Sequence, residues 1–254
     1  MSQNPFIDAE ARLSRAQEHI SEFDNSMKTL LNQNLSSIVQ QNSDGTGYLH
    51  KLKLNEGVSI RTRLLAADAT NNLRAALDLL TAACARGGGA TRSYATSFPF
   101  SEDEAGWNDV VARKCKNISK PVTDYWKSLR PYKGGDDLLH GLSKIRNANE
   151  HWAITNIIIQ IFGLQAHFQD PSTSRMLAVL PFIVGDVEEV LLFASDNPAQ
   201  NYGLSALLSI RFDGVDGHNN SDPTWIFRSL HDKISDIIHT TKSIMYHNGV
   251  VPHP

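Results

Sequence analysis

The chain has 254 residues, of which 41% are hydrophobic and 20% are charged, and its formal net charge is −3. This length and composition suffice for one large globular core. The slightly acidic balance excludes a protein that binds nucleic acid through its overall charge, although it leaves room for a local basic patch.

The cysteine content and the absence of targeting signals favour a cytoplasmic protein. Cys84 and Cys115 are the only cysteines, too few for a disulfide framework. The first eight residues lack the basic and apolar regions typical of a signal peptide. The densest apolar stretch, residues 176–184, is too short to cross a bilayer. We therefore expect a reducing compartment and no membrane partner.

Residues 9–41 predict one long amphipathic helix that begins at an Asp8 N-cap and stops at Asn42–Gly45. Apolar residues recur along it at alternating spacings of three and four, which makes a single stripe. Such a stripe usually packs on its own domain, and the alternative is a coiled-coil homodimer. The stripe consists of Leu13, Ala16, Ile20, Phe23, Met27 and Leu30.

The next hundred residues are predicted to be mainly helical. Alternating residues over 48–54 favour a short strand, and the glycines after Arg86 stop the helix that precedes them. Asp136 is placed to cap the last helix of this part. The expected helices cover residues 59–85, 105–117, 121–129 and 136–149.

After residue 151 the sequence favours strands. A β-branched run covers 154–162, and the stretches 176–184 and 187–194 flank Gly185-Asp186, which is typical of a hairpin. A further strand is expected at 204–212, and Asp222-Pro223 begins a final helix.

The predicted fold class is therefore α+β, in one domain that spans residues 1–254. An N-terminal helical bundle, about 9–150, is followed by an antiparallel β-meander that a C-terminal helix covers, about 151–247. No linker rich in Gly, Pro or Ser separates the two parts.

A first group of candidate binding residues lies on the predicted helix 59–85. Asn72 falls on the apolar stripe of this helix, where a buried amide must find hydrogen-bond partners. Arg74 and Asp78 are four residues apart and can pair. These residues either form a polar network that fixes how the helices pack or make the floor of a binding cleft.

A second group is the polar run from Arg146 to His151. Its spacing resembles the Arg-x4-6-His motif of the HEPN superfamily, whose members are helical bundles, often dimeric, and in many cases metal-independent ribonucleases. The resemblance implies that Arg146 stabilises phosphate charge, that His151 acts as general acid or base, and that Asn147 is the polar follower of the arginine. The alternative is a polar helix end at which Arg and His complement the helix dipole.

Several segments taken together resemble a family of uncharacterised bacterial proteins. The family implies no activity, but it groups Asn72, Arg74 and Asp78 with Asn147 and His151 as recurring polar positions. Asn149, within the same motif, is a further candidate binding residue. Glu150 stands where the family usually has lysine. The shared segments are Ala9–Leu13, Asp68 to Asp78, Phe98-Pro99-Phe100 with Trp107, Pro131 to Asp136, and Leu142 to His151.

Two hypotheses follow for the function. In the first, Asn72, Asp78, Asn147 and His151 meet in one pocket of a ligand- or partner-binding protein. In the second, the chain is a HEPN-like ribonuclease with RNA as its substrate, in phage defence or a toxin system. No cofactor or metal is expected, because the chain has none of the usual nucleotide, zinc or hydrolase motifs.

Overall fold

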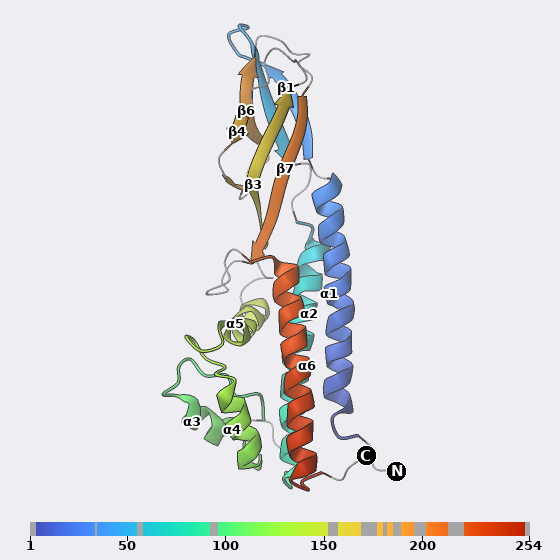
Figure 1. Ribbon diagram of the computed structural model, residues 1–254, viewed down its shortest axis with the longest axis vertical. Coiled ribbons are helices and arrows are strands. Elements are labelled where there is room, and N and C mark those ends of the chain that lie inside the picture. The colour runs from blue at the N-terminus through green and yellow to red at the C-terminus, as the bar shows by residue number, and fades with distance from the viewer. Residues whose placement is uncertain are drawn as a thin grey trace.

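The computed structural model describes residues 4–33, 35–54, 58–91, 96–151, 157–168, 177–179, 182–184, 189–195, 202–212 and 221–251. Helices form one end of an elongated molecule and strands form the other (Figure 1). The α+β class and the N-terminal helices agree with the prediction from the sequence.

Long helices that run side by side make the bundle (Figure 1). They are α1 (Ile7–Gln33), α2 (Ile60–Gly87) and α6 (Pro223–His247). The apolar stripe of α1 packs into the core that these helices share, with Ile20 and Phe23 fully buried. The stripe is therefore used within the chain and is not left for a coiled-coil dimer.

The prediction that the first helix runs to residue 41 is wrong. The helix ends at Gln33, and Leu35–Gln41 forms strand β1, which turns back into β2 (Tyr48–Leu54). Gly45 adopts a φ of 72° in the turn, where its missing side chain removes the strain. Asp8 lies in the first turn of α1 and is not its N-cap, because the helix begins one residue earlier.

Shorter helices lie to one side of the bundle (Figure 1), and the last two of them pack on it. They are α3 (Trp107–Lys114), α4 (Lys120–Ser128) and α5 (Asp137–His151). The indole Nε1 of Trp126 on α4 donates a buried 3.0 Å hydrogen bond to Thr241 Oγ1 on α6, which fixes that crossing. Asp136 caps α5 as predicted, since its Oδ1 accepts from the backbone N–H of Leu139 at 2.9 Å.

All strand pairings among the described residues are antiparallel, but they do not follow the order of the sequence. One sheet has the order β1-β2-β6, and in the other β3 pairs with β4, β5 and β7. The remaining strands are β3 (Ile157–Phe168), β4 (Leu177–Val179), β5 (Phe182–Val184), β6 (Glu189–Ser195) and β7 (Tyr202–Phe212).

This order corrects the predicted meander at two strands, and one correction is that β7 pairs with β3 and not with β6. The stretch expected to form a hairpin with 176–184 becomes β6 and pairs with β2 in the other sheet. The expected turn at Gly185-Asp186 lies outside the described residues.

The final helix begins where the sequence predicts. Asp222 accepts from the backbone N–H of Thr224 at 2.8 Å, and Pro223 occupies the first turn. The expected cover of a sheet face is met only in part, because α6 contacts β7 but packs mainly on α1 and α2 (Figure 1).

Candidate functional site

The predicted pair Arg74–Asp78 forms and ties α2 to its surroundings. Arg74 Nε donates to both carboxylate oxygens of Asp78 at 3.2 Å, and Arg74 Nη1 donates to Ser143 Oγ on α5 at 3.1 Å. Asp78 Oδ1 also accepts from the backbone N–H of Phe98 at 2.9 Å. The Arg74 guanidinium carbon lies 4.3 Å from the centroid of the Phe100 ring. These contacts favour the structural interpretation of this pair.

Asn72 points to a different neighbour. Its Oδ1 accepts from Arg12 Nη1 of α1 at 3.1 Å, and its Nδ2 donates to the backbone oxygen of Asp68 at 2.8 Å. Asn72 and Asp78 are six residues apart, so their directions differ by roughly 120° around the helix axis. Asn72 therefore faces α1 while Asp78 faces the Phe98 loop, and the two do not meet in one pocket.

The predicted catalytic residues lie at the end of α5. The helix continues to His151, two residues beyond its expected end, so Arg146 and His151 belong to one continuous helix. Arg146 is half-buried and Asn147 is exposed. The side chains of Asn149 and His151 are outside the described part of the structure. Their roles and the pairing with Arg146 remain predictions.

An open hollow of about 580 Å³ lies between the α4–α5 loop and α6. The loop contributes Arg130 and Asp136, the start of α5 contributes Asp137, and α6 contributes Trp225 and Lys233. The side chains around it therefore combine an indole with two cations and two carboxylates. The other lining residues are Leu129, Gly135, Leu138 and Ser229.

Tight turns shape the loop wall of this hollow. Arg130 has a φ of 52°, and its carbonyl accepts from the N–H groups of both Tyr132 and Asp136, at 2.8 and 2.7 Å. A Cβ on Gly135 would lie 2.3 Å from the same carbonyl oxygen, so this position requires glycine.

The polar side chains of the loop are held in place. The Arg130 guanidinium donates to the Gly134 carbonyl at 3.1 Å and to the Tyr132 hydroxyl at 3.4 Å. The hydrogen bond with Tyr132 raises the pKa of Arg130 further. Asp136, besides capping α5, forms an ion pair with Lys233 that joins the loop to α6.

Helical spacing builds the opposite wall. Trp225, Ser229 and Lys233 follow one another at intervals of four, which places them on one face of α6. Ile226 and Phe227, next to the tryptophan, are fully buried. Trp225 itself is 49% exposed, which is unusual for so large an apolar side chain.

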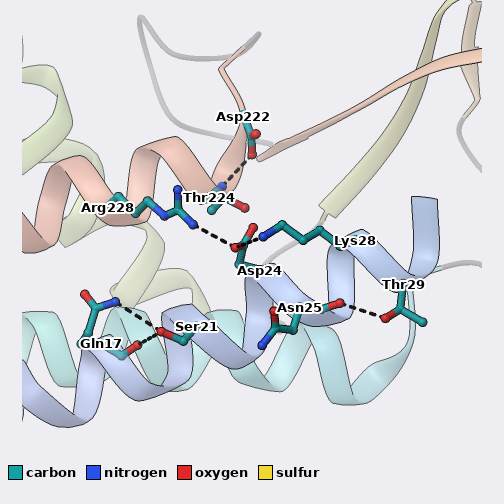
Figure 2. Close-up of polar contacts among 9 residues, drawn as sticks. All are labelled: Gln17, Ser21, Asp24, Asn25, Lys28, Thr29, Asp222, Thr224 and Arg228. Atoms are coloured by element: carbon teal, nitrogen blue, oxygen red, sulfur yellow. Dashed lines mark hydrogen bonds and ion pairs between the residues drawn. The ribbon is translucent and has the colours of Figure 1, made fainter. Parts of the chain in front are cut away.

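A separate polar cluster fixes α6 against α1 (Figure 2). Asp24 Oδ2 accepts from Arg228 Nη2 of α6 at 2.9 Å and from Lys28 Nζ of α1 at 2.8 Å. The cluster anchors the first part of α6, from which Trp225 extends.

Sequence reasoning missed this hollow. Trp225 falls among the apolar residues of the last helix, and the segment from Pro131 to Asp136 indicated only a family motif and the Asp136 cap. That same segment held the sequence signal for the site, because a Gly-Asp pair just before a helix is typical of a tight turn that leads into the helix.

Within the described ranges, no three His, Cys, Asp or Glu side chains gather as a metal site would require. None of the described helices combines the length and apolar character needed to cross a membrane. Comparisons with protein-family models, curated proteins and solved structures gave no match. The HEPN motif and the bacterial family therefore remain resemblances.

Proposed function

We propose that the protein is a partner-binding module that receives a segment of another protein in the hollow between α6 and the α4–α5 loop. The observation that carries the proposal is the half-exposed indole of Trp225 in the wall of that hollow. Tryptophan and arginine are enriched among the residues that dominate binding energy at protein interfaces.

The rigidity of the hollow supports this function. The Asp136–Lys233 ion pair and the hydrogen bonds of the Arg130 carbonyl hold the loop before a partner arrives. A preformed surface loses little conformational entropy on association. The hollow also has a volume suited to an anchoring side chain, and its charged rim can select among partners.

Site-specific photo-crosslinking in the native cells tests the proposal. A benzoylphenylalanine in place of Ser229 should capture a discrete protein, and Trp225→Ala should abolish the adduct. The same photoprobe in place of Gln17, on the exposed face of α1, is the matched control and should not capture that protein. Failure to capture any protein from position 229, or equal capture from both positions, would contradict the proposal.

A second candidate is the HEPN-like ribonuclease, acting on RNA in the cytoplasm. It is favoured by the continuation of α5 through His151, which keeps Arg146 and His151 on one helix. In this hypothesis Arg146 binds phosphate oxygens, His151 transfers the proton, and Asn147 follows the arginine.

Cleavage of labelled single-stranded RNA in the presence of EDTA tests this candidate. His151→Ala should slow cleavage by about 100-fold or more. His247→Ala removes an exposed histidine at the end of α6 and should leave the rate unchanged. No cleavage by the wild type, or equal cleavage by both variants, would exclude it.

A further inference from the structure

A second hollow, of about 440 Å³, lies along the groove between α1 and α2. Asp8, Ala11, Arg12 and Arg15 of α1 line it together with Leu79 of α2. It shares no lining residue with the hollow beside Trp225 and does not depend on the function proposed for that site.

Arg12 is held over this groove by a neutral group. Its Nη1 donates to Asn72 Oδ1 at 3.1 Å, and the Asn72 amide is fixed in turn by the backbone oxygen of Asp68 at 2.8 Å. Among the described residues Arg12 forms no ion pair, so the hydrogen bond orients the guanidinium without cancelling its charge. A guanidinium has five N–H donors, and only one is used by this contact.

Arg15 is the second cation, one turn further along α1. It pairs with Glu18 on the same helix, and both side chains are about half exposed, at 55% and 54%. An ion pair this exposed is weak and can exchange for a better partner. With Asp8 as the one carboxylate among the lining residues, the lining carries a net charge of +1.

His19 lies next along this face of α1, but it does not line the hollow. Arg15 follows Arg12 by three residues and His19 follows Arg15 by four, which places the three residues on one face of α1. His19 is only 9% exposed, and within the described part of the chain its Nδ1 has no hydrogen-bond partner. Because this nitrogen is itself closed off from solvent, it takes no part in the proposed site.

We infer that Arg12 and Arg15 bind the phosphate group of a small ligand in the α1–α2 groove. Two guanidinium groups supply donors in the planar geometry that phosphate oxygens match. Leu79 and Ala11 provide an apolar surface for the remainder of the ligand. Asn72 is a positioning residue that aims Arg12.

Isothermal titration calorimetry of the full chain tests the site, with inorganic phosphate and adenosine monophosphate as probes. If adenosine monophosphate binds more tightly than inorganic phosphate, the part of the ligand beyond its phosphate also contacts the groove. If the two affinities are equal, free phosphate is the ligand. Both results support the site. If neither probe gives a heat of binding at concentrations up to about 10 mM, the inference is overturned.

Matched arginine variants localise the binding. Arg12→Gln and Arg15→Gln should each weaken phosphate binding about tenfold or more, the effect of losing a charge-assisted contact. Arg113→Gln removes an exposed arginine on α3 and should have no effect. Equal affinity in all three variants means nonspecific attraction and overturns the inference.

Asn72→Asp separates positioning from mere structural support. The aspartate can still accept from Arg12, but it neutralises the charge that the neutral amide preserves. A folded Asn72→Asp protein should therefore bind phosphate about tenfold more weakly. Unchanged affinity in that variant would show that Asn72 only supports the helix packing.

Discussion

Arg74 and Asp78 face each other one turn apart on α2, and the Arg74 Nε lies 3.2 Å from both carboxylate oxygens. The arginine side chain is only 8% exposed and the aspartate 29%. The pair also binds Ser143 on α5 and the backbone of Phe98. It therefore joins one helix of the bundle to α5 and to the loop before α3.

Asp78→Ala should destabilise the protein by about 3 kcal/mol, because it leaves a buried guanidinium without its counter-charge. It also removes the acceptor of the Phe98 N–H. Urea denaturation followed by circular dichroism measures the loss. Asp124→Ala breaks an exposed pair of the same i,i+4 spacing and should cost less than about 1 kcal/mol. Equal losses in the two variants would contradict the structural role of Arg74–Asp78.

Thr241→Val should lower the free energy of unfolding by about 1–3 kcal/mol, although valine and threonine side chains have nearly the same shape. The valine cannot accept the hydrogen bond from Trp126 Nε1, and this donor is buried away from water. Comparing the unfolding free energies of wild type and variant measures the loss. Thr241→Ser retains the hydroxyl and serves as the control; if it is as unstable as the valine variant, the hydrogen bond is not the cause.

Gly135→Ala should destabilise the α4–α5 loop by about 1–3 kcal/mol, since the added methyl group clashes with backbone. Its Cβ would lie 2.3 Å from the Arg130 carbonyl oxygen and 2.8 Å from the Arg130 Cβ. The neighbouring Gly134→Asn, at a φ of 77° with open space around it, should cost less than Gly135→Ala, because asparagine adopts this conformation more readily than most residues. Thermal unfolding of both variants makes the comparison. A stable Gly135→Ala protein would show that the loop adapts.

The thiols of Cys84 and Cys115 should react very slowly with iodoacetamide at pH 8. Burial raises the pKa of each thiol to about 12, and the nearby charges of Arg86 and Lys114 oppose this shift only weakly. The reactive thiolate is therefore about 10⁻⁴ of each thiol at that pH. Mass spectrometry of the alkylated protein, with urea-unfolded chain as the positive control, measures the rates.

The same pKa shifts set the direction of a pH effect on stability. The unfolded thiols ionise near their ordinary value of 9.0, while the folded thiols hold their protons to about 12. Their contribution to stability is therefore complete below pH 9 and is lost as the pH rises toward 12. Rapid alkylation of the folded protein at pH 8 would contradict both the burial and the raised pKa.

Local signals allowed much of the helical part to be predicted. The caps at Asp136 and Asp222 and the i,i+4 pair Arg74–Asp78 depend on residues within one or two turns of each other, and the apolar stripe of α1 repeats at such short spacings. Strand β1 was missed because its pairing with β2 outweighs the helical periodicity of Leu35–Gln41. The pairing of β2 with β6 connects residues far apart in the chain, so no local sequence pattern predicts it.

The candidate site was less predictable for the same reason. The spacing of Trp225 suggests a core position, and its exposure depends on where the α4–α5 loop meets α6 through Asp136 and Lys233. The hydrogen bond from Arg12 to Asn72 likewise arises from the packing of α1 on α2.

The affinity for the protein captured at position 229 tests the central claim most directly. Trp225→Ala should weaken binding by about 30-fold or more, which corresponds to a loss of about 2 kcal/mol at a dominant interface residue. Leu64→Ala removes an apolar side chain that is 46% exposed on α2 and should leave the affinity unchanged. Equal affinities of Trp225→Ala and the wild type would contradict the claim that the partner binds beside Trp225.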